Sequence, residues 1–413
     1  MQVAAALPDR RHVLNACVDR YRFTVAFAAS LVANKVSLLP STHTPEVIRQ
    51  LTQFAPDVFC LTDDARCQID LPRVRFPELT PGAVLWEPVA IEPDRLAAYV
   101  FTSGSTGTPL PYQKTWGRLV NCVRFEAQRL GLLDGRSHTL VGTVPPQHMY
   151  GFESTVLVAL QSGNAFSAGR PFYPADVASE LASVPAPRML VSTPVHLRTL
   201  LGTDVELPAT ELVLSATAPL SQNLAREVEK RYGGRLLEIY GSTETGQIAS
   251  RRSAETAEWQ LFDGVRLFAE SEATFAEGGH VEQRTPMCDV LEITAEDRFL
   301  LHGRLSDLVN IAGKRSSLAY LNHQLNAIPG VVDGAFFVRE PDASATSGVT
   351  RVAAVVVAPG MDAIALNEQL RRRIDSVFLP RPLLFVDSLP RNDTGKLPHD
   401  SLRALAATAM KRT

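Results

Sequence analysis

Cysteine is scarce in this chain of 413 residues, and its five occurrences lie far apart. Their number is odd and no two of them form a CxxC pair, so neither a disulfide framework nor a structural zinc site is expected. Scattered thiols of this kind are typical of a reducing compartment, and the sequence therefore predicts a cytoplasmic location. The five are Cys17, Cys60, Cys67, Cys122 and Cys288.

Long apolar runs and an excess of one charge are also lacking. The most apolar early run, from Phe23 to Ala33, is too short to cross a bilayer and predicts a buried helix, so no membrane span is expected. The 41 basic and 44 acidic residues are interspersed, which gives no reason to expect nucleic acid or an anionic membrane as a partner. The length and a hydrophobic content of 45% predict two or three folded domains, or one large domain with an appendage.

Three common signatures are missing as well: the Walker P-loop, the Rossmann glycine fingerprint and the nucleophile elbow of hydrolases. Instead, an apolar run from Leu96 to Phe101 predicts a buried strand that opens into Thr102-Ser103-Gly104-Ser105-Thr106-Gly107-Thr108-Pro109. Glycines let the backbone approach phosphate oxygens and the hydroxyls add donors without bulk, so this loop can wrap a polyphosphate. Taken alone, the segment could equally be an ordinary surface loop.

Strands and helices alternate from residue 96 to residue 240, which predicts an α/β layer structure with largely parallel strands. Beyond Gly246 the pattern changes to short alternating strands as far as Leu301, and residues 305–413 predict a small α+β domain. Strands are expected at 96–101, 138–144, 188–192, 211–215 and 235–240, and helices at 116–130, after 151, from 194 and at 220–232.

Three further segments follow the glycine loop in order: Glu238-Ile239-Tyr240-Gly241-Ser242-Thr243-Glu244-Thr245-Gly246, then Gly303 to Arg315, then Pro390 to Lys396. In this order the four segments resemble the core motifs of the adenylate-forming superfamily, which includes acyl-CoA synthetases, nonribosomal peptide adenylation domains and luciferase. The resemblance covers essentially the whole chain. It implies a large N-terminal α/β adenylation domain at 1–303, a hinge at 304–307 and a small mobile C-terminal α+β domain at 308–413. Because the chain is short for the family before the glycine loop, a trimmed N-terminal subdomain is expected.

The resemblance implies ATP and Mg²⁺ as cofactors and divides the chemistry of acid activation among the motifs. Glu244 would ligate Mg²⁺, Thr243 would contact the α-phosphate, and Lys396 would bridge the carboxylate and α-phosphate oxygens. Asp289, fifteen residues before Arg304, stands where the family places an aspartate on the ribose hydroxyls. Tyr240 and Gly241 would pack on the adenine, Arg304 would serve the ribose or the hinge, and Ser306 takes the hinge position. The other implied nucleotide-binding residues are Thr102, Ser103, Gly104, Ser105, Thr106, Gly107, Ser215, Ala216, Thr217, Glu238, Ile239 and Ser242.

The segment Pro145 to Phe152 resembles the one that lines the acid pocket in this family. His148 could position an aromatic carboxylate, or it could stand at a helix N-terminus without a ligand. A mix of histidine, tyrosine and small hydroxyl residues suits a compact aryl acid better than a long acyl chain. The implied pocket residues are His148, Tyr150, Phe152, Thr193, Ser215 and Gly241.

The short format and the segment Pro109 to Gly117 resemble the ligases of aryl-polyene and xanthomonadin pigment clusters. Those enzymes activate a hydroxybenzoate and load it onto an acyl carrier protein. The leading hypothesis is therefore a ligase that joins 4- or 3-hydroxybenzoate, through an aryl-adenylate, to a phosphopantetheine thiol, of a carrier protein rather than of CoA. The alternatives are a short- or medium-chain acyl-CoA synthetase and a catalytically impaired module that binds a nucleotide or an acyl-adenylate.

Departures from the family pattern leave one question about the phosphate loop open. The lysine that often follows the loop proline is replaced by Leu110, and the next lysine is Lys114, four residues on. Whether Lys114 takes over a phosphate contact is not decided by the sequence. The hinge position holds Ser306 where aspartate or lysine is common, and the two residues before Asp289 also differ from the family pattern.

Overall fold

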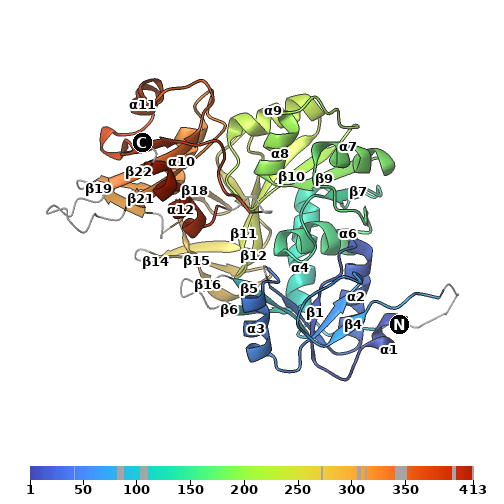
Figure 1. The fold of residues 1–413 in the computed structure, drawn as a ribbon. Helices are drawn as coiled ribbons and strands as arrows, with labels where there is room; N and C mark the ends of the chain where they lie inside the picture. The colour runs from blue at the N-terminus through green and yellow to red at the C-terminus, as the bar shows by residue number, and fades with distance from the viewer. Residues whose placement is uncertain are drawn as a thin grey trace.

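Two large sheets, each flanked by helices, precede a smaller C-terminal α+β part in the computed structural model of the chain (Figure 1). The structure describes residues 1–40, 42–80, 88–102, 110–270, 273–304, 308–311, 314–339, 351–392 and 397–411. The predicted α/β fold class, with a large N-terminal and a small C-terminal part, is confirmed.

The first sheet has the strand order β4-β3-β1-β2-β5-β6. All neighbours are parallel except β6 (Leu110–Thr115), which returns antiparallel to β5 (Leu96–Thr102). The sequence did not predict β6, which places Thr102 opposite Leu110 in the ladder, so the two ends of the glycine loop lie side by side. The other strands are β1 (His12–Asn15), β2 (Val36–Leu39), β3 (Phe59–Thr62) and β4 (Arg73–Arg75).

Helices pack against this sheet through apolar faces that the sequence predicted in part. The apolar run becomes α2 (Arg20–Val32), and its Phe23 and Phe27 enter the main core. The helix α3 (Pro45–Phe54) begins at a proline, and the Thr44 hydroxyl accepts from the Val47 amide, as expected of an N-cap. A short helix, α1 (Gln2–Ala6), precedes them.

The second sheet has nine strands in the order β17-β18-β13-β12-β11-β10-β9-β7-β8. From β8 to β11 the neighbours are parallel, and from β11 to β17 they are antiparallel. The carboxyl ends of the parallel strands therefore share one edge, where ligands bind in open α/β sheets. The strands are β7 (Thr139–Gly142), β8 (Ala165–Phe166), β9 (Arg188–Ser192), β10 (Leu212–Ser215), β11 (Arg235–Ser242), β12 (Gly246–Arg251), β13 (Trp259–Leu261), β17 (Asp289–Ala295) and β18 (Arg298–Arg304).

The helix α4 (Trp116–Leu130) has the predicted bounds and lies between the two sheets (Figure 1). The Thr115 hydroxyl caps its start and Gly131, at φ 76°, ends it. The chain then forms α5 (Met149–Gly151), a π-helix η1 (Phe152–Leu157), α6 (Val158–Ser162), α7 (Pro174–Ser183), α8 (Pro194–Leu201) and α9 (Gln222–Tyr232). None of the helices in the described ranges is long and apolar enough to span a membrane.

Arg20 connects the two large sheets from the first residue of α2. It is completely buried, and its guanidinium donates to the carbonyls of Gly142, which ends β7, at 2.9 Å and of Val144 at 3.1 Å. It also donates to the Ser167 carbonyl at 2.9 Å, next to β8. These bonds hold the start of the predicted acid-pocket segment against α2.

The C-terminal part has a hydrophobic core of its own, built from residues that follow 308. Its strands and helices are β19 (Leu308–Ile311), β20 (Lys314–Ser317), α10 (Leu318–Asn326), β21 (Asp333–Arg339), β22 (Arg351–Val357), α11 (Ala363–Arg371), a 3₁₀ turn (Ser376–Phe378), β23 (Leu383–Phe385) and α12 (His399–Met410). The large N-terminal part also has a small antiparallel sheet with β14 (Arg266–Glu270), β15 (Ala273–Gly278) and β16 (Val281–Pro286).

Candidate active site

The turn between β11 and β12 carries Thr243 and Glu244, both half-buried. Ser242 and Thr245 close the turn with reciprocal bonds: each amide nitrogen donates to the other's hydroxyl oxygen at 3.2 Å. A side chain at Gly241 would place its Cβ 2.2 Å from the Gly246 carbonyl oxygen, so the register shift there requires glycine. The turn thus presents the predicted metal ligand next to the carboxyl end of β11.

Tyr240 and Asp289, predicted for the adenine and the ribose, meet in the structure. The Tyr240 phenol donates to Oδ2 of Asp289 over 2.6 Å. The Tyr240 ring is buried and packs against Trp259 and Phe299, each with a centroid distance of 5.5 Å. Asp289 also pairs in register with Arg304 across the β17–β18 hairpin, which accounts for the spacing of fifteen residues.

The segment after β10 contains a strained backbone position. Thr217 has φ 79°, a left-handed conformation that glycine adopts readily and threonine rarely does. Such strain costs about 1–3 kcal/mol and is concentrated at functional sites. Next to it, Ala216 is buried and Ser215 is completely buried, and the Ser215 Oγ has no hydrogen-bond partner among the described residues. A buried hydroxyl without a partner is suited to an incoming polar ligand.

The predicted acid-pocket segment is held by hydrogen bonds at three positions. His148 is half-buried and caps α5, because its Nδ1 accepts from the Tyr150 amide at 3.3 Å. The buried Tyr150 phenol donates to the Ser192 carbonyl at 3.1 Å, and burial raises the pKa of Tyr150. Gln147 donates from Nε2 to the Cys17 carbonyl at 2.6 Å. The structure therefore places the Tyr150 phenol at the carboxyl end of β9.

Two predicted pocket residues have structural roles instead. Phe152 is completely buried and packs edge-on against Phe23 and Phe27 of α2, so it belongs to the core and does not line an open pocket. Thr193 is also completely buried, and its hydroxyl caps α8 by accepting from the His196 amide at 3.4 Å. Neither side chain is presented to a substrate in this structure.

Two predicted nucleotide-binding side chains are likewise used elsewhere. The Glu238 carboxylate is buried and accepts from Arg251, at 2.7 Å from Nη2 and 2.8 Å from Nε, and from the Ser253 hydroxyl at 2.7 Å. Ile239 is a core residue. The motif around them positions Tyr240 and the turn, while these two side chains stabilise β11.

A set of polar side chains that sequence reasoning missed lies at the carboxyl ends of β7 and β9. Nδ1 of His196 and the Thr143 hydroxyl lie 2.8 Å apart, and the hydroxyls of Thr143 and Ser192 lie 3.2 Å apart. Thr143 follows β7 directly and Ser192 ends β9. The available signal was topological: hydroxyl residues end adjacent parallel strands, and this edge is the usual ligand-binding edge.

The AMP-binding enzyme family matches residues 4–265, which is more than half of the chain. The chain belongs to the AMP-binding enzyme family. It is an enzyme, as the sequence predicted, and the recognition of the adenylate-forming superfamily is confirmed at this level. The subfamily of hydroxybenzoate ligases from pigment clusters stays a prediction.

This AMP-binding enzyme has curated relatives that are ligases of aromatic acids. It is 29% identical over 299 residues to 4-coumarate–CoA ligase of Rhodobacter capsulatus, covering 71% of this chain and 73% of the relative. It is 24% identical to 4-chlorobenzoate–CoA ligase of Arthrobacter sp., with 76% and 67% covered. It is 26% identical to 3-hydroxybenzoate–CoA ligase of Aromatoleum sp., with 79% and 69% covered.

Solved structures share the fold of this AMP-binding enzyme over nearly all of its length. ATP-bound MatB from Rhodopseudomonas palustris superimposes with a TM-score of 0.80 at 20% identity, covering 98% of this chain and 90% of MatB. O-succinylbenzoate CoA synthetase MenE from Bacillus subtilis, in complex with ATP and magnesium ion, gives a TM-score of 0.80 at 19% identity, with 97% and 91% covered.

Several predicted site residues lie outside the described residues. They are Ser103, Gly104, Ser105, Thr106 and Gly107 of the glycine loop, Ser306 of the hinge, and Lys396. Thr102 ends β5 and Arg304 ends β18, and only their backbones are described. The roles of all these residues stay predictions.

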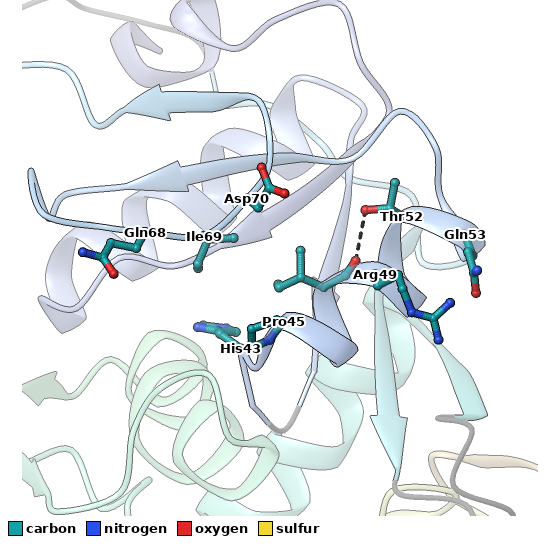
Figure 2. A pocket seen from close by; sticks show the side chains of 9 residues that line it. His43, Pro45, Arg49, Thr52, Gln53, Gln68, Ile69 and Asp70 are labelled. Atoms are coloured by element: carbon teal, nitrogen blue, oxygen red, sulfur yellow. Dashed lines mark hydrogen bonds between the residues drawn. The ribbon is translucent and has the colours of Figure 1, made fainter.

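A pocket of about 440 Å³ lies beside α3, and none of its lining residues was predicted for the site (Figure 2). It is closed by α3 on one side and by the segment after β3 on the other, and burial lowers the pKa of His43 at its edge. The lining residues are His43, Pro45, Ile48, Arg49, Thr52, Gln53, Gln68, Ile69 and Asp70.

Proposed function

We propose that this enzyme activates a small aromatic carboxylic acid with ATP and transfers the acyl group to a phosphopantetheine thiol. The observation that carries the proposal is the hydrogen bond between Tyr240 and Asp289. It holds a carboxylate, suited to accept from a vicinal diol, beside a buried aromatic ring. The turn that carries Glu244 follows β11. Thr217, with its left-handed backbone, follows β10 of the same sheet. The acid-pocket segment follows β7 of that sheet.

In the first step a carboxylate oxygen of the acid attacks the α-phosphorus of ATP, and the bond to pyrophosphate breaks. Catalysis then depends on alignment and on charge compensation at the phosphorus. Asp289 accepts from the ribose hydroxyls, Tyr240 orients Asp289, and the Thr243 hydroxyl donates to the α-phosphate. The segment from Thr102 to Gly107 holds the departing phosphates, and Lys396 bridges the reacting oxygens.

In the second step a thiolate sulfur attacks the carbonyl carbon of the acyl-adenylate, and AMP leaves. We assign this step to a different orientation of the C-terminal part, 308–413, about a hinge at 304–307 that includes Ser306. Such a rotation would remove Lys396 and admit the phosphopantetheine arm.

Glu244 fits a Mg²⁺ ion that is shared with the substrate. Mg²⁺ keeps several waters and is commonly held by one or two carboxylates together with phosphate oxygens. Within the part of the chain that the structure describes, no group of three or more histidine, cysteine, aspartate or glutamate side chains could form a complete protein cage. A single carboxylate on a turn agrees with that donor set, and the bound ion would neutralise charge on the triphosphate.

For the acid, we propose a hydroxybenzoate, with 4- or 3-hydroxybenzoate first. Three relatives named above act on coumarate, chlorobenzoate and 3-hydroxybenzoate. Thr143, Ser192 and His196 form a chain of polar atoms at the ligand-binding edge, and Ser215 adds a buried hydroxyl without a described partner. These atoms could accept from or donate to a ring hydroxyl. The relatives use CoA, whereas the pigment-cluster resemblance favours an acyl carrier protein, so the acceptor is assigned only as a phosphopantetheine thiol.

The test measures acid-dependent pyrophosphate release with a panel of hydroxybenzoates, coumarate and fatty acids, followed by thioester formation with CoA or with a holo carrier protein. Release with hydroxybenzoates supports the proposal. Release with fatty acids alone would assign the chain to short- or medium-chain acyl-CoA synthetases. A folded sample that binds AMP but releases no pyrophosphate with any acid would identify a catalytically impaired binding module.

A further inference from the structure

A buried polar cluster lies beneath the turn that carries Glu244, where β6, α4, η1 and β12 meet. Lys114 and Glu153 are each only 3% exposed, and both line a cavity of about 10 Å³, room for about one water molecule. Lys114 is the one buried residue of β6. Its ammonium makes no hydrogen bond and no close ion pair with any described residue.

A buried ammonium is costly unless an opposite charge is near. Burial lowers the pKa of Lys114, and the carboxylates of Glu153 and Glu244 act in the opposite direction. Burial raises the pKa of Glu153, and Lys114 opposes that shift. Lys114 therefore lies in the fields of two carboxylates, one on η1 and one on the predicted metal turn.

The other titratable members of the cluster contribute no opposite charge near neutral pH. Burial raises the pKa of Glu126 to about 8, so its carboxyl is protonated. Burial lowers the pKa of His280 to about 4, so its ring is neutral. Lys114 and Glu153 line the cavity together, and Arg118 is the other basic residue in its lining.

The turn that carries Glu244 packs against Glu153, and its residues Thr245 and Gly246 line the same cavity as Lys114. Gly246 has φ 75°, and a Cβ there would lie 3.2 Å from Sγ of Cys122 and 3.6 Å from Oε1 of Glu153. Sγ of Cys122 also lies 3.6 Å from Oε1 of Glu153. Arg118, which lines the same cavity, donates from Nη2 to the Glu244 carbonyl at 3.2 Å.

Glu153 also connects the cluster to the acid-pocket segment, which ends at Phe152. Glu153 is the second residue of the π-helix η1 and follows His148 by five residues. Single-turn π-helical segments are frequent at functional sites, because the wider turn displaces a side chain that an α-helix would place elsewhere. Here the π-helical turn places the Glu153 carboxylate beside β12.

We propose that Lys114 and Glu153 are positioning residues for the magnesium–triphosphate. The pair holds the Glu244 turn against the His148 segment. Lys114 also adds positive charge beneath the metal ligand, in a chain where Leu110 replaces the lysine that often follows the glycine loop. Leu110 is 50% exposed and carries no charge. The inference rests on the proposed function, since it takes Glu244 as the metal ligand.

The test compares the binding of two nucleotides to the full chain by calorimetry, with no acid present. One is α,β-methylene-ATP with Mg²⁺, and the other is AMP, which lacks the β- and γ-phosphates. Lys114→Met should weaken binding of the triphosphate ~10–100-fold, the usual effect of losing a partner behind a metal ligand, and leave the Kd for AMP nearly unchanged. Lys35→Met is the matched control: Lys35 is also buried, but its Nζ donates to the carbonyls of Pro8 and Arg10 at 2.6 and 2.7 Å. It should change neither Kd.

Glu153→Gln tests the pair from the other end and keeps the proposal testable if Lys114→Met does not fold. It should produce the same selective loss of triphosphate affinity. The double variant should lose less triphosphate affinity than the two single variants together, because neither buried group is then left without its partner. Equal weakening for AMP and the triphosphate, or no weakening in either variant, overturns the inference. Wild-type protein that binds neither nucleotide overturns the proposed function itself.

Discussion

The phenol of Tyr240 donates to the Asp289 carboxylate over 2.6 Å although their strands, β11 and β17, are separated by β12, β13 and β18. Adjacent strands lie about 4.8 Å apart, so a flat sheet would keep these side chains out of reach. The sheet curls around the rings of Trp259 and Phe299, which fill the space beneath Tyr240. The aromatic layer thereby sets the distance between the proposed adenine and ribose contacts.

Tyr240→Phe should raise the KM for ATP ~10-fold and also lower the thermal stability, because the bond joins two strands of the sheet. A hydrogen bond to a charged group contributes about 1.5–3 kcal/mol, and without it Asp289 loses its orientation toward the ribose. The measurement is pyrophosphate release against ATP concentration. Tyr232→Phe is the control, because its hydroxyl is buried without a described partner and lies on α9. An unchanged KM in Tyr240→Phe would show that the bond serves the sheet alone.

Phe152→Ala should destabilise the protein by about 3–5 kcal/mol, because a completely buried ring is removed from between Phe23 and Phe27. The KM for the acid, measured below the unfolding transition, should stay within a factor of about two, well under the tenfold change that 1.4 kcal/mol of lost binding would give. His148→Ala should do the opposite and raise that KM with a small change in stability. A large KM effect from Phe152→Ala without a loss of stability would restore Phe152 to the acid pocket.

Much of the fold could be predicted from the sequence because its signals are local. The bounds of α4 and β9 follow from the periodicity of apolar residues along the chain. The strand β6 could not, since Pro109 and Pro111 give its start the character of a loop. The pairing of β6 with β5 depends on tertiary contacts that no local pattern shows.

The motifs predict which residues belong to the candidate site, and they do not predict the directions of the side chains. The spacing of Asp289 and Arg304 survived, because a hairpin converts sequence spacing into register. A motif does not say which neighbour a side chain will meet: the Glu238 carboxylate pairs with Arg251, and the Phe152 ring packs against Phe23 and Phe27. The buried cluster around Lys114 and Glu153 comes from four separate elements, so no local pattern could have indicated it.

Glu126→Gln should make stability less dependent on pH between about 4.5 and 8. The pKa of Glu126 is raised from 4.5 to about 8, because its carboxyl is buried on α4. In that window the folded state holds a proton that the unfolded state has released, so the stabilising contribution falls as pH rises and levels off above the folded pKa. In urea unfolding at pH 5.5, 7 and 8, the free energy of unfolding of the variant relative to that of wild type should rise with pH. A constant difference would place the Glu126 pKa near its ordinary value.

Glu244→Gln should lower kcat for adenylation at least ~100-fold, because the glutamine amide is a poor substitute for an anionic magnesium ligand. Added Mg²⁺ should recover part of the loss, while AMP binding stays unchanged. Glu229→Gln is a control from the same sheet region, since its carboxylate pairs with Arg252 at 2.9 Å on the surface of α9. A Glu244 variant with wild-type magnesium dependence would remove Glu244 from the metal site.

Lys396→Ala should abolish adenylation and leave thiol transfer from a supplied aryl-adenylate largely intact. The reason is that a lysine bridging the carboxylate and α-phosphate oxygens stabilises charge only while the phosphorus is attacked, whereas the second step breaks the bond to AMP from the thiol side. The two half-reactions are measured separately, by acid-dependent pyrophosphate release and by thioester formation from synthetic aryl-AMP. Arg391→Ala serves as a control from the same segment, because its guanidinium is paired with Asp333 at 2.7 and 2.8 Å within the C-terminal part and should affect stability first. Equal loss of both half-reactions in Lys396→Ala would mean that the lysine supports the closed arrangement of the chain in general, and the assignment of two orientations about residues 304–307 would lose its chemical basis.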